Sequence, residues 1–477
     1  MFIDTPTVGD VCMQFGSRYI RSRGMYFSAA ERGMFSSMIW NWPHNDVQVI
    51  VVTDGSRILG LGDLGANGMG IPIGKLALYC AAGGIAPHRV LPVMLDVGTN
   101  NQKLLDDPDY IGVREERLEG QDYVDLVDEF MYAVFQRWPG VVVQFEDFET
   151  KKAVPMLERY REKFRVFNDD IQGTGSVTLS CLMSAARNAK STITEQRILC
   201  AGAGSAGLGV CNQLVLGMVA AGMTKDDAMA QFCIVDMHGA LGKKDGVHEN
   251  PHYSGKGQIN ESQMEWVNPS VSDGSSLLQV IEDFKPTVLL GLSTVPKLFN
   301  EEVVKTMHKH CATPIIMPMS NPTSRCECTA EEAYQWTDGQ AVVASGSPFP
   351  AYTHTDGRTL VPSQCNNMYV FPGLGLGASL AGVSKITDSI LFAAAKACTD
   401  SMTEEEIGWG RTFPSLSRIR DVSHRIAVAV IKQAQAEDLA TKITPRDLKR
   451  DGSLEAYVSR KMYFPSYVPL VDPRKHG

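Results

Sequence analysis

The sequence of 477 residues carries a formal net charge of −9, with 44% hydrophobic and 21% charged residues. This length and composition are typical of a globular protein of two or three domains. There is no basic block, and no apolar run approaches the roughly 18 residues of a membrane span, so we expect neither nucleic acid nor a membrane as a partner.

Short β-branched segments alternate with helical segments in the first part of the chain, which predicts an α/β fold. Buried strands are expected at 47–55, 90–98, 140–148 and 164–170. Between the last two, apolar side chains recur at helical spacing, at Met156, Leu157, Tyr160 and Phe164. These segments predict a β-α-β unit with two parallel strands.

A second set of strands is expected further along the chain, at 196–204, 232–239, 286–293 and 313–323. Beyond about residue 370 the pattern becomes helical. The predicted fold class is therefore α/β, with two parallel-sheet domains and C-terminal helices.

Four acidic residues follow two strands of the first set. Glu146 and Asp147 end one strand, and Asp169 and Asp170 end the next. Parallel strands joined by a right-handed crossover end on the same edge of the sheet, where open α/β sheets bind their ligands. A single aspartate here would be more typical of a helix cap. Together, the carboxylates favour a hard divalent cation, Mg²⁺ or Mn²⁺.

Three glycine-rich segments fit G-x-G-x-x-G in strict or relaxed form, at 60–65, 202–207 and 373–378. Only the second follows a clear strand, precedes a helix and has an acidic residue, Asp236, at the end of the next strand. It predicts a Rossmann-like dinucleotide site, and tight packing is expected for the other two. The residues of the predicted loop are Gly202, Gly204, Ser205, Ala206 and Gly207.

The strand that ends at Asp236 bears on the choice between NAD and NADP. Asp236 is typical of the group that holds the ribose 2′-hydroxyl of NAD. His238, Lys243 and Lys244 follow closely, and their positive charge suits the 2′-phosphate of NADP. We expect NADP, with NAD as the alternative.

A glycine-rich loop system after the first strand contains Arg57 and Lys75. Such charges are usually solvated surface groups. Lys75, however, has apolar neighbours in the sequence near a helix start, which predicts a depressed pKa suited to a general base. Asn321 and Asn367 lie in turns at strand ends. Asparagine in such positions usually stabilises the turn itself, but these two residues also lie on the edge of the sheet where ligands bind.

With these residues assembled, the chain resembles the malic enzyme family, which oxidatively decarboxylates L-malate to pyruvate and CO₂ with a divalent metal and NAD⁺ or NADP⁺. The resemblance covers nearly the whole chain. It rests on the segments TPTVG (5–9), RILGLGDLG and NGMGIPIGKLALY (57–79), LDVGT (95–99), QFEDF (144–148), FNDDIQGT (167–174), SNPTS (320–324), ASGSPF (344–349) and NNMYVFPG (366–373).

The resemblance implies roles for the acidic cluster and the lysine. It implies that Glu146, Asp147 and Asp170 are the metal ligands. It also implies that Lys75 is the base that takes the C2 hydroxyl proton, with Asp169 beside it.

The resemblance implies substrate contacts as well. Arg57 matches the residue that binds a malate carboxylate, and Asn321 and Asn367 match groups that contact substrate and nicotinamide. The family's tyrosine general acid should immediately precede TPTVG, but that position is Asp4. Family members also carry about a hundred further residues before this motif, so we expect either a shortened chain or a different last proton transfer.

We expect a substrate- and metal-binding domain at 1–168, a Rossmann-like domain at 169–366, a helical return to the first domain at 367–440 and an extension at 441–477. The resemblance implies a homodimer or homotetramer, located in the cytoplasm, or in mitochondria if a targeting segment is missing. Two other hypotheses are an inactive homologue that binds nucleotide and metal as an oligomer partner, and a decarboxylase of a larger 2-hydroxy acid.

Overall fold

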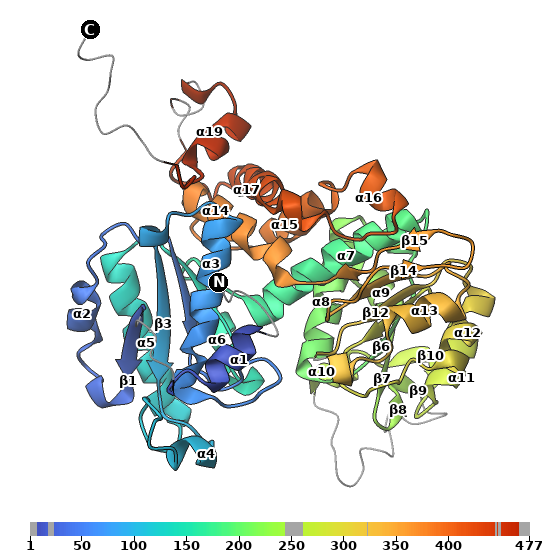
Figure 1. Cartoon of the computed structure of the whole chain (residues 1–477), viewed down its shortest axis with the longest axis horizontal. Coiled ribbons are helices and arrows are strands. Elements are labelled where there is room, and N and C mark those ends of the chain that lie inside the picture. Colours follow the sequence, from blue (N-terminus) through green and yellow to red (C-terminus); the bar gives the residue numbers. More distant parts are fainter. Residues whose placement is uncertain are drawn as a thin grey trace.

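Two parallel β-sheets lie side by side, bridged at one end by C-terminal helices (Figure 1). This computed structural model describes residues 7–17, 23–243, 261–321, 323–443, 446 and 450–466. No helix in these ranges is long and apolar enough to cross a bilayer. The architecture confirms the predicted fold class.

The first sheet has five strands, all parallel. In spatial order they are β1 (Met25–Ser28), β3 (Val90–Asp96), β2 (Val49–Thr53), β4 (Val142–Phe145) and β5 (Val166–Asn168). Helices α5 (Gly120–Arg137) and α6 (Thr150–Tyr160) cover one face, and α3 (Gly70–Ala81) packs on the other. The chain changes direction across the sheet between β2 and β4, so their carboxyl ends flank a crevice.

The second sheet has seven strands, parallel except for the pairing of β7 with β8. Its spatial order is β16 (Ser363–Gln364), β13 (Val342–Ser345), β12 (Ile315–Pro318), β11 (Val288–Gly291), β6 (Ile198–Ala201), β7 (Phe232–Asp236) and β8 (Gly239–Ala240). Here the reversal lies between β6 and β11. This is the arrangement of a doubly wound nucleotide-binding sheet.

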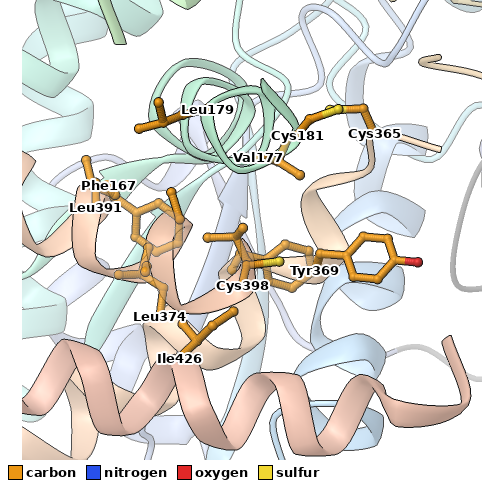
Figure 2. Close-up of a cluster of buried hydrophobic side chains, with 14 of the residues drawn as sticks. Phe167, Val177, Leu179, Cys181, Cys365, Tyr369, Leu374, Leu391, Cys398 and Ile426 are labelled. Carbon is orange, nitrogen blue, oxygen red and sulfur yellow. The ribbon is translucent and has the colours of Figure 1, made fainter. Parts of the chain in front are cut away.

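One hydrophobic core runs continuously between the two sheets. Helix α7 (Thr174–Asn188) packs against α8 (Ser205–Ala220) of the second domain and against α15 (Asp388–Thr399). Helices α14 (Phe371–Ala381) and α17 (Ile419–Ala436) complete this core, and α14 also contacts α3 of the first domain. Figure 2 shows part of this core, with Phe167 from β5, Val177 from α7, and Leu374 and Ile426 from the C-terminal helices among its side chains.

All eight strands expected from the sequence are present, with shorter bounds. In the two large sheets, β1, β8, β13 and β16 were not expected, because they are short and carry no distinct alternation of polar and apolar residues. Three of these strands, β1, β8 and β16, lie at the edges of the sheets.

Candidate active site

A cavity of about 230 Å³ lies between the carboxyl ends of the two sheets. Its lining includes Lys75, Glu146, Asp170, Asn321, Asn366 and Asn367. The first three come from the first sheet and its helix α3, and the asparagines come from loops that follow strands of the second sheet. Both crevices predicted by strand topology therefore open into one cavity.

The three predicted metal ligands converge at the edge of this cavity. Glu146, Asp147 and Asp170 each offer a carboxylate oxygen, and these oxygens lie within 4.8 Å of one another. Asp147 adopts a left-handed backbone conformation (φ 57°), and its N–H donates to Asp170 Oδ2 at 2.7 Å. Burial raises the pKa of Glu146 and Asp147 well above their ordinary values.

These carboxylates fit a hard divalent cation. Within the described part of the chain, Asp147 Oδ2 is buried and has no hydrogen-bond partner, an arrangement that costs free energy unless a cation or donor completes it. A set of oxygen ligands is also what Mg²⁺ and Mn²⁺ prefer.

Lys75 lies beside the cluster, but the predicted depression of its pKa is wrong. Its Nζ is 2.6 Å from Asp169 Oδ2 and 3.0 Å from Glu146 Oε1. Burial by itself lowers the pKa of the Lys75 ammonium, but the charges of Asp169 and Glu146 outweigh burial and raise the pKa well above its ordinary value. The sequence neighbours of Lys75 are apolar, whereas its neighbours in the fold are carboxylates.

Asp169 is fully buried and is held from two sides. Besides Lys75, Asn367 Nδ2 donates to Asp169 Oδ2 at 3.1 Å and to the Thr174 hydroxyl at 3.1 Å. Gly173 makes room for this carboxylate, because a Cβ there would lie 1.9 Å from Asp169 Oδ1. Asn367 thus joins the second domain to the lysine–aspartate pair.

Arg57 does not line the cavity. Its side chain is exposed and donates to the Thr150 hydroxyl at 2.7 Å, while its backbone N–H donates to the Asp147 carbonyl at 3.2 Å. Its role as a carboxylate binder stays a prediction. Asp4 and Lys244 lie outside the described residues.

The predicted dinucleotide loop joins β6 to α8 as expected. Gly202 has φ 130°, and a Cβ there would lie 2.5 Å from the Leu292 carbonyl oxygen. A Cβ on Gly207 would lie 2.1 Å from Gly202 O, whereas one on Gly204 would meet nothing within 4 Å. Two glycines thus allow the tight turn, and the third leaves open space at a helix N-terminus, which fits a pyrophosphate.

Asp236 ends β7, and its Oδ1 accepts the N–H of His238 at 2.6 Å. His238 follows β7 by two residues, and Lys243 lies in β9 (Gly242–Lys243). Both side chains are exposed. The glycines of 373–378 instead lie inside α14 and pack against neighbouring helices, which confirms the expected packing role.

Three polar side chains close to these sites were missed by sequence reasoning. Tyr79 follows Lys75 by one helical turn, and Gln144 precedes Glu146 by two strand positions, so periodicity alone could have placed both on the site's faces. Glu327 is fully buried beside the loops after β11 and β12. No local pattern signals Glu327, because its contacts depend on how the loop with Ser293, 34 residues away, folds against the loop with Ser320.

Two family models match most of the chain. The malic enzyme N-terminal domain matches residues 2–161, and the malic enzyme NAD-binding domain matches residues 171–435. The chain belongs to the malic enzyme family. The family resemblance inferred from sequence motifs is thereby confirmed.

Relatives within the family extend along nearly the whole chain. The NADP-dependent malic enzyme of Dictyostelium discoideum is 44% identical over 98% of this chain and 82% of its own length. The mitochondrial NAD-dependent malic enzyme 2 of Arabidopsis thaliana is 46% identical over 98% of this chain and 77% of its own length. A malic enzyme structure from Entamoeba histolytica shares the fold, with a TM-score of 0.62 and 24% identity over 96% of this chain and 81% of that chain.

Proposed function

We propose that this chain catalyses the oxidative decarboxylation of L-malate to pyruvate and CO₂, with reduction of a nicotinamide dinucleotide and dependence on a divalent metal. The observation that carries the proposal is the cavity in which Lys75, Glu146 and Asp170 face Asn321 of the second domain. Asp147 completes the acidic cluster, and Asp169 pairs with Lys75. Family membership and relatives at 44–46% identity support the same activity.

Lys75 acts as the base for the C2 hydroxyl proton, and Asp169 orients its ammonium through the 2.6 Å contact. Glu146, Asp147 and Asp170 hold the metal. When bound there, Mg²⁺ or Mn²⁺ supplies Lewis acidity toward the substrate oxygen and a positive charge that disfavours the ammonium form of Lys75.

Residues of the second domain bind and orient the other reactant. The loop with Gly202, Gly204 and Gly207 holds the dinucleotide, which supplies the hydride acceptor. Asn321, whose Oδ1 accepts the Ser347 hydroxyl at 2.7 Å, and Asn367 orient substrate and nicotinamide from the cavity wall. Arg57 binds a malate carboxylate after turning from Thr150.

For the cofactor we propose NADP, supported by the basic residues His238 and Lys243 and by the NADP-dependent relative of Dictyostelium discoideum. NAD is the alternative, and the Arabidopsis relative is named for it. We also propose a homodimer or homotetramer. A cytoplasmic location stays a prediction, and the names of relatives include mitochondrial and hydrogenosomal forms.

The test measures nicotinamide absorbance with L-malate and Mn²⁺, before and after removal of the metal by a chelator. We expect malate-dependent reduction that the chelator abolishes and added Mn²⁺ restores. Asp170→Asn should weaken activation by Mn²⁺ much more than it weakens nucleotide binding. Binding of Mn²⁺ and nucleotide without any turnover would instead support the inactive homologue, and turnover only of a larger 2-hydroxy acid would overturn the choice of malate.

A further inference from the structure

Two polar side chains of helix α3 contact two polar side chains of strand β4. Lys75 and Tyr79 lie one turn apart on α3, and Gln144 and Glu146 lie two residues apart on β4, so each pair shares a face. Lys75 Nζ is 3.0 Å from Glu146 Oε1, and the Tyr79 hydroxyl donates to Gln144 Oε1 at 2.7 Å. The two pairs meet side by side.

A third hydrogen bond links the pairs into one chain, because Gln144 Nε2 donates to Glu146 Oε2 at 2.7 Å. As a metal ligand Glu146 must be ionised, and an ionised carboxylate only accepts hydrogen bonds, so the amide nitrogen of Gln144 must then face Glu146. The amide oxygen then faces Tyr79 and requires a donor there. The Tyr79 hydroxyl meets this requirement, and burial raises its pKa well above the ordinary value, so it keeps its proton.

The three hydrogen-bonded side chains are buried. Tyr79 and Gln144 are 0% exposed and Glu146 is 2% exposed. The amide of Gln144 therefore has no solvent to replace either partner, and a change at Tyr79 alters the donor offered to Glu146.

Resting on the proposed metal site, we infer that Tyr79 and Gln144 form a positioning pair for Glu146. The pair occupies Oε2 of the Glu146 carboxylate and fixes its orientation, which leaves Oε1 beside Lys75 and keeps the group within the acidic cluster. Tyr79 and Gln144 thus couple the placement of a proposed metal ligand to the placement of the proposed base, without touching either reactant.

The test measures the dissociation constant of Mn²⁺ from the full chain by electron paramagnetic resonance, without malate or nucleotide. Gln144→Met removes the donor to Glu146 and should weaken Mn²⁺ binding by about 10- to 100-fold, the usual effect of losing a partner of a metal ligand. Tyr79→Phe keeps the ring and removes one hydroxyl, and should weaken binding by about 2- to 10-fold.

Tyr160→Phe is the matched control. Tyr160 is 1% exposed in the same domain, and its hydroxyl donates to Asp128 at 2.7 Å, away from the cavity. This variant should lose stability without a change in Mn²⁺ affinity. Because the pair acts as one unit, Tyr79→Phe combined with Gln144→Met should weaken Mn²⁺ binding no more than Gln144→Met alone.

The outcomes separate this inference from the proposed function. If the parent binds Mn²⁺ and both single variants bind it equally well, the positioning pair is wrong while the metal site stands. If Gln144→Met does not fold, the comparison of Mn²⁺ affinity between Tyr79→Phe and Tyr160→Phe decides. Weaker binding only in Tyr79→Phe supports the positioning pair, and equal affinity contradicts it. If the parent binds no Mn²⁺, the proposed metal site is wrong and the positioning pair falls with it.

Discussion

The pKa of Lys75 lies well above its ordinary value because the carboxylates of Asp169 and Glu146 stand within 3.0 Å of its ammonium and outweigh the effect of burial. A base must be neutral before it can take a proton. The proposed role of Lys75 as a base therefore requires that the negative charge around it be compensated. The same acidic cluster that fits a divalent cation sets this requirement.

Lys75→Ala should lower kcat by about two to four orders of magnitude, the usual contribution of general acid–base catalysis. A small free amine should restore part of the rate, since it can enter the space left by the side chain. Steady-state kinetics with malate and Mn²⁺ provide the measurement, and Lys309→Ala on the exposed end of α12 (Glu301–His310) is the control. A change confined to KM would contradict the role.

The preference for NADP over NAD is also expected to depend on a few individual side chains. Basic side chains stabilise the extra charge of a 2′-phosphate, so kcat/KM should be higher for NADP⁺ than for NAD⁺. Lys243→Ala together with His238→Ala should reduce the ratio of the two kcat/KM values several-fold. A higher kcat/KM for NAD⁺ in the unmodified protein would contradict the proposed preference for NADP⁺. It would indicate that Asp236, rather than the basic residues, decides the cofactor.

The acidic cluster could be predicted from the sequence because the carboxyl ends of neighbouring parallel strands meet at one edge of a sheet, independently of side-chain packing. That rule placed Glu146, Asp147, Asp169 and Asp170 together, and the family resemblance then selected Glu146, Asp147 and Asp170 as the metal ligands. The pKa of Lys75 could not be predicted, because its partner Asp169 lies 94 residues away and the sequence shows only apolar neighbours. The exposed position of Arg57 also depends on a distant partner, Thr150.

At the scale of elements, Glu327 ties together two loops of the nucleotide domain. Its Oε1 accepts from the N–H and hydroxyl of Ser293 at 3.0 and 2.9 Å and from the hydroxyl of Ser320 at 2.6 Å. Ser293 follows β11 and Ser320 follows β12. One buried carboxylate thus fixes the carboxyl ends of two neighbouring strands.

Glu327→Gln should weaken nucleotide binding several-fold, because its NH₂ group would replace Oε2, which accepts the N–H of Ser320 at 3.4 Å, and would bring two donors together. Mn²⁺ affinity should not change, since the acidic cluster lies on the other sheet. Titration of each ligand separately provides the measurement. Glu331→Gln, at an exposed position of α13 (Ala330–Trp336), is the control, and equal losses in both variants would contradict the assignment.

Arg117 plays a comparable part in the first domain. Its guanidinium makes two hydrogen bonds to Asp63, at 2.8 and 2.6 Å, and one to the Asp54 carbonyl at 2.9 Å. The side chain is 1% exposed. It anchors the loop after β2 that carries Arg57.

Arg117→Met should lower the free energy of unfolding by about 3–5 kcal/mol, the usual cost of breaking a buried ion pair. Arg358→Met removes an ion pair with Asp356 in which both side chains are more than 40% exposed, and it should cost at most about 1 kcal/mol. Denaturant titrations of both variants provide the comparison. Equal costs would show that the Arg117 network is not structural.

On the scale of the whole molecule, the two sheets share one core, so they should not unfold separately. Leu374 is 0% exposed in this core, whereas Leu126 is 0% exposed in a cluster confined to the first domain. Each change to alanine should cost about 2–5 kcal/mol. Leu374→Ala should speed hydrogen exchange in both β4 and β6, and Leu126→Ala should act more strongly on β4. Exchange confined to one sheet in Leu374→Ala would contradict a shared core.

The placement of α14 and α17 has a consequence for synthesis of the chain. The inner face of the first sheet is complete only when helices more than two hundred residues later arrive to cover it. At about 5–20 residues per second, a ribosome needs on the order of tens of seconds to reach them after β5. During that interval we expect the part of this apolar face that α3 does not cover to stay exposed, so slow elongation late in the message would favour aggregation over folding.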